Sequence, residues 1–245
     1  MFMKIIKLDA IDSTNSFLKK MAENSLVENY TVVVANCQTS GRGQMETEWV
    51  SEPGKNLTFS VFFKVESLLI MNQKYLNFAV ALSVFDVLNE MDIPKLTIKW
   101  PNDIMAGGMK IGGILIENTL KGAEIQSSVV GIGLNVNESF SEQKEFTATS
   151  LIDIKEKNFD LDELLLSLVD KLKNNTEQLR LQKHEILEKR YLNVLHKKNV
   201  PSMFKTDQNV LFMGKIIGVS KEGKLQIELT DETVQEFGIK EVSFA

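Results

Sequence analysis

KWPNDIMAGGMKIGGILIEN, residues 99–118, is the stretch that decides how the chain folds. Trp100 stands before Pro101, which biases it towards an extended backbone. Asn102 and Asp103 then supply side chains that favour a turn. The stretch therefore predicts a short strand, a tight polar turn and a hairpin that returns along a strongly apolar strand.

The returning strand combines a lysine with bare backbone. Gly107 and Gly108 predict the hairpin turn, and Lys110 opens the apolar run KIGGILIE. Gly112 and Gly113 weaken a strand interior, and glycines there often mark a close approach of a ligand or of another backbone. This combination indicates a site more than a core.

Composition places the chain among globular proteins. Of its 245 residues, 43% are hydrophobic and 25% are charged, and no apolar run approaches the length of a membrane span. Charged residues interrupt the N-terminal segment, so we expect no signal peptide, and the single cysteine, Cys37, fits a reducing cytoplasm. The formal charge of -5 argues against a nucleic-acid binder. We expect His184 and His196 to be solvated in a charged helical stretch, which disfavours a zinc site and a Ser-His-Asp hydrolase.

Periodicity predicts an α+β chain in two domains, residues 1–198 and residues 199–245. Strands are expected at 4–8, 31–38, 57–65, 97–100, 110–118 and 127–137, and helices at 12–25, 72–91, 160–175 and 177–195. The helix at 72–91 is apolar almost all round, which predicts that it packs on both sides. From Pro201 onwards short strands alternate with glycine turns, which predicts a small β-barrel-like appendage.

Residues 40–56 form a long polar loop without apolar periodicity, and such loops inside a domain are usually functional or disordered. The loop lacks the third glycine of a dinucleotide fingerprint, and no Walker A motif occurs in the chain. Taken singly, several residues also have ordinary structural explanations. Lys110 could be a solvated lysine on a strand edge, and Asn102 with Asp103 could form a plain turn. Ser13 and Thr14 could only cap a helix, and Trp49 and Trp100 could be core aromatics.

The order of the motifs along the chain is more specific than any one of them. DSTN (12–15), Q-x-x-GRG before a Trp (38–49), KWPND (99–103), KIGGILIE (110–117) and GIGLN (131–135) resemble, in sequence and spacing, the biotin protein ligases. The resemblance spans nearly the whole chain, and KWPND with the following strand is its most specific part.

That resemblance implies a fold and an activity. The fold is a mixed β-sheet with helices packed on it, of the class II synthetase-like kind, followed by a small C-terminal SH3-like β-barrel. The activity is formation of biotinyl-5'-AMP from biotin and ATP, with Mg²⁺, and transfer of biotin to one lysine of a biotin carboxyl carrier domain. The implied setting is the cytoplasm, without nucleic acid or membrane, and nothing decides between a monomer and a homodimer.

The resemblance also carries roles onto individual residues. Biotin contacts are implied for Ser13, Thr14, Gln38, Gly41, Arg42, Trp49, Lys110, Gly112 and Gly113. ATP contacts are implied for Arg42, Lys110 and Asn135, and catalytic roles for Lys110, Arg42, Asp103 and Asn102. No metal ligand is assigned.

Elementary chemistry agrees with these roles. A carboxylate that attacks an α-phosphate brings two anions together, so the site needs cations and donors more than an acid-base pair. Lys110, Arg42 and Mg²⁺ would supply them. In the second step a carrier lysine must lose a proton, and Asp103 is the nearest carboxylate, either as a base or as a group that only orients the amine.

The loop departs from the resembled pattern. Relatives often carry GRGRxGR before the Trp, whereas this chain has GRGQMETEW, in which Gln44 replaces the second arginine and Glu46 and Glu48 add negative charge. Retention of the adenylate by this loop is therefore open. The chain starts almost directly at the first strand, so we expect no helix-turn-helix and no DNA binding. Two alternatives stay open: a lipoate or octanoate ligase or transferase of related fold, and a non-catalytic biotin-binding protein.

Overall fold

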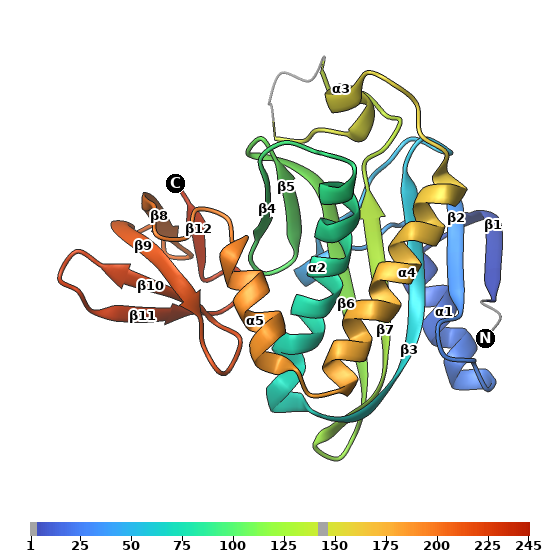
Figure 1. The fold of residues 1–245 in the computed structure, drawn as a ribbon, viewed down its shortest axis with the longest axis horizontal. Coiled ribbons are helices and arrows are strands. Elements are labelled where there is room, and N and C mark those ends of the chain that lie inside the picture. Colours follow the sequence, from blue (N-terminus) through green and yellow to red (C-terminus); the bar gives the residue numbers. More distant parts are fainter. Residues whose placement is uncertain (1–3, 142–146) are drawn as a thin grey trace.

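The computed structural model of the chain describes residues 4–141 and 147–245. Its larger part is a seven-stranded sheet in the order β1-β2-β3-β7-β6-β5-β4 (Figure 1). The strands are β1 (Ile5–Ile11), β2 (Val32–Gln38), β3 (Leu57–Leu69), β4 (Leu96–Lys99), β5 (Asp103–Ala106), β6 (Met109–Lys121) and β7 (Glu124–Leu134). Only β1 and β2 pair in parallel and the other neighbours are antiparallel, which confirms the expected mixed sheet.

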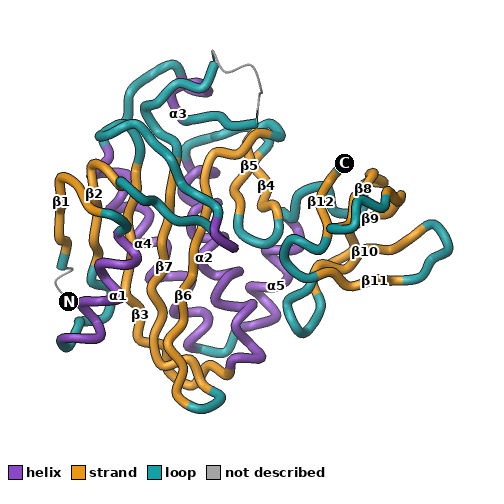
Figure 2. The backbone as a smooth tube through the Cα atoms, turned by 180° about the vertical axis from the view of Figure 1, so that it is seen from behind, coloured by secondary structure: helices purple, strands orange, loops and turns teal. Residues whose placement is uncertain are grey.

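Helices cover both faces of this sheet. On one face lie α2 (Gln73–Glu90), α4 (Leu161–Arg180) and α5 (His184–Asn193), and on the other lies α1 (Thr14–Asn24) (Figures 1 and 2). The predicted packing of α2 on both sides is confirmed, because it contacts β4, β5 and β6 on one side and α4 and α5 on the other. Val32 and Val33 point to opposite faces and belong to two separate apolar clusters, as strand alternation requires.

The helix boundaries follow from their caps. Ser13 accepts a hydrogen bond from the Ser16 N–H at the start of α1, and the Asp160 side chain accepts from Asp162 N and Glu163 N at the start of α4. A short helix, α3 (Leu151–Lys155), precedes α4. None of the described helices is long and apolar enough to span a membrane.

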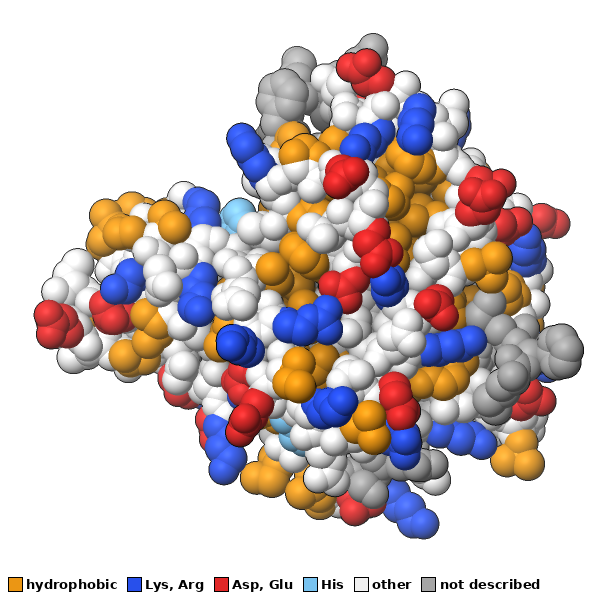
Figure 3. All heavy atoms as spheres, viewed as in Figure 1, with side chains coloured by type: hydrophobic (Ala, Val, Ile, Leu, Met, Phe, Trp, Pro, Cys, Tyr) orange, Lys and Arg blue, Asp and Glu red, His pale blue; other side chains and the backbone are white. Residues whose placement is uncertain are grey.

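The C-terminal strands form a second sheet beside β4 and α5 (Figure 1). They are β8 (Pro201–Thr206), β9 (Leu211–Val219), β10 (Leu225–Leu229), β11 (Val234–Phe237) and β12 (Val242–Phe244), in the order β11-β10-β9-β8-β12. The two edge strands do not pair within the described residues, so the small β unit is confirmed and a closed SH3-like barrel is not. Hydrophobic side chains are exposed on the β8–β9 end of this sheet (Figure 3), among them Met203, Leu211 and Met213.

The prediction of two solvated helical histidines is wrong. His184 opens α5 and stacks on Tyr75, with 4.2 Å between the ring centroids. His196 lies beyond the end of α5, and its Nδ1 is 2.8 Å from the Thr97 hydroxyl. Both rings are half-buried, and burial lowers the pKa of each below its usual value. Both therefore have structural partners, and neither lines the cavity described below.

Candidate functional site

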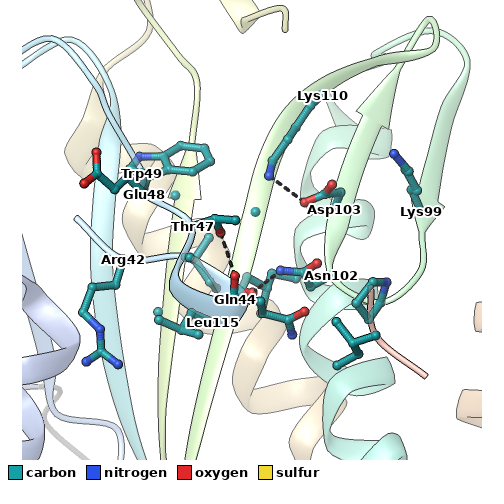
Figure 4. Close-up of a pocket in the computed structure, with 18 of the residues that line it drawn as sticks. Arg42, Gln44, Thr47, Glu48, Trp49, Lys99, Asn102, Asp103, Lys110 and Leu115 are labelled. Carbon is teal, nitrogen blue, oxygen red and sulfur yellow. Dashed lines mark hydrogen bonds and ion pairs between the residues drawn. The ribbon is translucent and has the colours of Figure 1, made fainter. Parts of the chain in front are cut away.

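A cavity of about 470 Å³ lies between the large sheet and the C-terminal sheet (Figure 4). Its walls come from the start of α1, the end of β2 with the loop that follows, the start of β3, the KWPND turn, β6 and β7, and the C-terminal sheet. This volume is in the range of small-molecule sites, and such sites often lie between domains. The KWPND stretch and the long polar loop, which are far apart in sequence, therefore face the same space.

One end of the cavity carries hydroxyls and an amide. Thr14 donates to Gln38 Oε1 from its backbone N–H at 2.8 Å and from its hydroxyl at 3.0 Å. Ser60 Oγ lies 2.7 Å from the Thr14 hydroxyl and 2.6 Å from Asn15 Oδ1. Thr14, Asn15 and Ser60 are buried and Gln38 is half-buried, so this connected network is pre-organised for a neutral ligand with both donors and acceptors.

The floor of the cavity is bare backbone. A Cβ on Gly131 would lie 2.4 Å from Asn15 Oδ1, and one on Gly133 would lie 2.3 Å from the Trp49 indole. Gly113 also faces the indole, since its Cβ would be 3.3 Å from the ring. The Trp49 ring therefore rests on glycines of β6 and β7, and its Nε1–H is buried without a hydrogen-bond partner in the described residues. The indole, packed on the bare strand, therefore forms an apolar wall of the cavity next to its polar end.

The other end of the cavity is charged. Lys110 Nζ lies 2.7 Å from Asp103 Oδ1 and 5.7 Å from the centre of the Trp49 ring (Figure 4). The pairing of β5 with β6 shifts by one residue between Ile104 and Met105. Without this bulge, strand alternation would put Lys110 on the face opposite Gly113, whereas here both face the cavity. The bulge therefore aims the lysine at the site.

Backbone contacts hold both partners of this pair. The Lys110 N–H donates to Thr147 O and the Thr149 N–H donates to Lys110 O, each at 2.9 Å. Asn102 Nδ2 donates to Ile114 O at 2.8 Å, which ties the KWPND turn to β6. Lys110 and Asp103 thus have fixed main-chain positions, while their side chains stay partly exposed to the cavity.

Arg42 does not point to the charged end of the cavity, where we expected it to act together with Lys110. Its guanidinium is directed away from Lys110 (Figure 4). It lies 3.3 Å from Glu117 Oε1 and 3.3 Å from Ser16 Oγ. Glu117 also accepts from Asn15 Nδ2 at 3.0 Å, so it links the loop to the polar end. In the described state Arg42 is therefore engaged with protein groups at the rim of the cavity.

Most of the predicted site residues line this cavity, and three do not. Those that line it are Ser13, Thr14, Gln38, Arg42, Trp49, Asn102, Asp103, Lys110 and Gly113. Gly41 packs against the backbone of Trp49 within the loop, where a Cβ would be 2.2 Å from Trp49 O. Gly112 lies against the neighbouring strand, where a Cβ would be 3.0 Å from Gly133 O, so β-sheet packing accounts for it. Asn135 is buried and donates to Thr149 O at 3.0 Å; its contact with adenine stays a prediction.

Some residues of the site were missed from the sequence. Gly131 and Gly133 were treated only as part of a motif, although glycines two apart on a strand leave one face bare. Asn15 and Glu117 gave no separate signal. Lys99 and Lys240 also line the cavity, and Lys240 comes from the C-terminal sheet.

The residues of the cavity could bind a magnesium ion only together with the phosphates of a bound nucleotide. Within residues 4–141 and 147–245 no group of three His, Cys, Asp or Glu side chains could hold a metal by itself. Asp103 and Glu48 are the two carboxylates that line the cavity. Mg²⁺ commonly uses one or two carboxylates together with substrate phosphates and water.

Comparison with known proteins gives consistent results. Residues 8–135 match the Biotin/lipoate A/B protein ligase family. The chain is 33% identical over 150 residues to the bifunctional ligase/repressor BirA of Bacillus subtilis, covering 60% of this chain and 46% of that protein. It is 35% identical over 127 residues to the biotin–[acetyl-CoA-carboxylase] ligase of Paracoccus denitrificans, covering 51% of each. The chain thus spans about half the length of the curated relatives it matches.

A solved structure matches over the full length. The biotin protein ligase from Aquifex aeolicus in complex with biotin and ATP superposes with a TM-score of 0.79 at 28% identity, covering 100% of this chain and 99% of that one. The family match covers the α1 start, the loop, the KWPND turn and the glycine floor, whereas the C-terminal wall of the cavity lies outside the matched residues. This chain therefore belongs to the Biotin/lipoate A/B protein ligase family.

Proposed function

We propose that this protein is a biotin protein ligase, which forms biotinyl-5'-AMP from biotin and ATP and transfers biotin to a lysine of a biotin carboxyl carrier domain. One observation carries the proposal. A single cavity has a hydroxyl–amide end at Thr14 and Gln38, an apolar wall where Trp49 packs on bare glycines, and a charged end at Lys110. These three parts match, in order, a neutral ureido ring, an apolar ring with its chain, and a carboxylate.

The first step joins two anions. A biotin carboxylate oxygen attacks the α-phosphorus of ATP, an O–P bond forms, and the bond to pyrophosphate breaks. Lys110 is placed to neutralise the carboxylate and the phosphate, because its side chain is partly exposed to the cavity beside the Trp49 ring. Such preorganised charge, with positioning of the two reactants, supplies most of the catalysis in phosphoryl-type transfer. Mg²⁺, when bound with ATP, adds charge neutralisation on the phosphates.

The second step transfers the acyl group. The carrier lysine amine attacks the carbonyl carbon of the adenylate, a C–N bond forms, and the C–O bond to AMP breaks. The attacking amine must lose a proton, and Asp103 is the carboxylate nearest to Lys110 in the cavity. An Asp103→Asn variant distinguishes its two roles: a base gives a pH-dependent loss of transfer, whereas an orienting group gives a loss that is uniform with pH.

The decisive experiment compares acids and products. Purified protein is incubated with Mg-ATP and biotin, lipoate or octanoate, and pyrophosphate release is measured together with the mass of a carrier domain. We expect pyrophosphate and a carrier mass increase with biotin alone. Turnover with lipoate or octanoate instead supports the related ligase or transferase. A biotin-dependent rise in melting temperature without pyrophosphate supports a non-catalytic biotin-binding protein.

Further properties extend the same proposal. We infer a division near residues 198 and 199, with an SH3-like relationship for the C-terminal sheet and a class II synthetase-like one for the larger part. Lys198 forms an isolated bridge with Ile216, so this boundary lies where the chain passes into the second sheet. A cytoplasmic location, the absence of nucleic-acid binding and a choice between monomer and homodimer stay predictions.

A further inference from the structure

One hydrogen bond joins the C-terminal sheet to the long loop across the cavity. Lys240 of the C-terminal sheet donates from Nζ to the backbone carbonyl of Met45 at 2.5 Å. Met45 lies in the turn Gln44–Glu46 of the long loop, and both Lys240 and Gln44 line the cavity. The C-terminal sheet therefore touches the loop at its tip and does more than pack beside the larger sheet.

The turn that presents Lys240 is well fixed. The Gly238 N–H donates to Glu241 Oε2 at 2.5 Å, and the Glu241 N–H donates to Gly238 O at 3.2 Å. Asp207 N donates to Glu241 O at 3.1 Å, which ties the turn to the end of β8. Lys240 thus extends from a closed turn whose position does not depend on the loop.

The sheet behind this turn is anchored to the larger part of the molecule. Trp100 of the KWPND turn donates from Nε1 to Gly223 O at 3.1 Å. Lys74 of α2, which is buried, donates to Ser220 O at 3.0 Å and pairs with Glu188 of α5 at 2.8 Å. These contacts fix the C-terminal sheet against α2 and the KWPND turn. The backbone of Lys240 is therefore held in place independently of the loop that its side chain contacts.

The loop tip needs such support. Met45 and Glu46 have φ angles of 51° and 64°, a left-handed backbone that non-glycine residues seldom adopt. The Gln44 side-chain oxygen is buried without a hydrogen-bond partner among the described residues. Apart from the bond to Lys240, the hydrogen bonds described for residues 43–48 join residues of the loop to one another. One example is the bond from the Gly43 N–H to Thr47 O. The loop also lacks its own cation at position 44.

We propose that Lys240 is a positioning residue that holds the loop tip at Met45 over the cavity and so slows the escape of the bound adenylate. The retention part rests on the proposed biotin ligation, whereas the loop contact itself does not. Lys240 takes over, from the other side of the cavity, the holding role that a second loop arginine would have. Its amine acts on a backbone carbonyl, so the side chains of the loop tip can vary without loss of the contact.

The test uses three variants and two readouts. Lys240→Met removes the donor and keeps the length of the side chain, Lys240→Arg restores a cation, and Lys205→Met is the control. Lys205 is an exposed lysine of β8 outside the cavity. The first readout is cleavage of the ligand-free protein by a glutamyl endopeptidase after Glu46 and Glu48. The second is the half-life of biotinyl-adenylate formed on the enzyme, measured by the loss of bound label after dilution.

We expect Lys240→Met to be cleaved about fivefold faster and to lose adenylate about fivefold faster, because one exposed charged hydrogen bond has a modest net effect. Lys240→Arg and the Lys205 control should behave like the unchanged protein. Equal cleavage of Lys240→Met and the control would overturn the loop contact. Faster cleavage with unchanged adenylate retention would overturn the retention role. Faster cleavage in a protein that forms no adenylate supports the contact and refutes the proposed ligation.

Discussion

Replacing Lys110 with alanine tests the charged end of the cavity. The substitution removes the ammonium group that lies 2.7 Å from Asp103 and leaves the carboxylate as the nearest charge. The reacting carboxylate and α-phosphate then lose the cation beside Trp49 and face the unpaired Asp103 carboxylate. Losing one preorganised group that stabilises developing charge typically costs a factor of about 100 to 1,000 in rate, or roughly 3–4 kcal/mol.

The same substitution has little effect on folding. The Lys110 and Asp103 side chains are 38% and 22% exposed, so solvent screens the pair and its contribution to stability is at most about 1 kcal/mol. For a chain of this size that corresponds to a change in Tm of about 2–4 °C at most. Rate and stability therefore separate, which an effect through misfolding would not allow.

The assay measures biotin-dependent pyrophosphate release and Tm on the same preparations. Lys121→Ala, at the exposed far end of the same strand, is the matched control, and its rate should stay within about twofold of the unchanged protein. Lys110→Arg keeps the charge but changes its shape, so part of the rate should return. If Lys110→Ala retains more than a tenth of the rate at an unchanged Tm, the assignment of Lys110 as the neutralising group is wrong.

Three further substitutions test other parts of the structure. Gly133→Ala should raise the KM for biotin at least tenfold, because its Cβ would lie 2.3 Å from the Trp49 ring and displace it; an unchanged KM contradicts the glycine floor. Asp160→Ala should lower the free energy of unfolding by about 1 kcal/mol in a urea titration, because two N–H groups of α4 lose their cap. Burial lowers the pKa of His196, so the unfolded chain binds more protons just below the usual histidine pKa and stability falls on acidification through about pH 6.5. The Tm of the unchanged protein should therefore fall as the pH is lowered through this range, and the Tm of His196→Asn should fall less. An equal fall in Tm in both proteins would refute this role of His196.

Local sequence chemistry predicted much of the fold and several site residues. The structure has the strands expected at 31–38 and 57–65, the helix with its all-round apolar pattern at 72–91, and the cap at Asp160. Each of these depends on neighbours within a few residues. Ser13 also caps α1 as the DSTN motif predicts. Residues whose position follows from their own strand or helix were therefore accessible from the sequence.

The remaining features depend on contacts between distant segments. Sequence patterns do not reveal the bulge at Ile104 that turns Lys110 to the cavity, because it arises from the pairing of two strands. Gly112 was expected to admit biotin, but the backbone it admits belongs to β7. The prediction that both histidines are solvated was wrong for the same reason. Tyr75 of α2 stacks on His184, and Thr97 of β4 hydrogen-bonds to His196.

The cavity is lined by residues from Ser13 at one end of the chain to Phe244 at the other. During synthesis the larger sheet can form while the last strands are still emerging, because protein parts made first generally fold first. The polar end and the glycine floor would then exist before Phe244 and Lys240 close the remaining wall. A nascent chain would thus hold an open half-site, and full enclosure of a ligand would report that translation of the C-terminal sheet is complete.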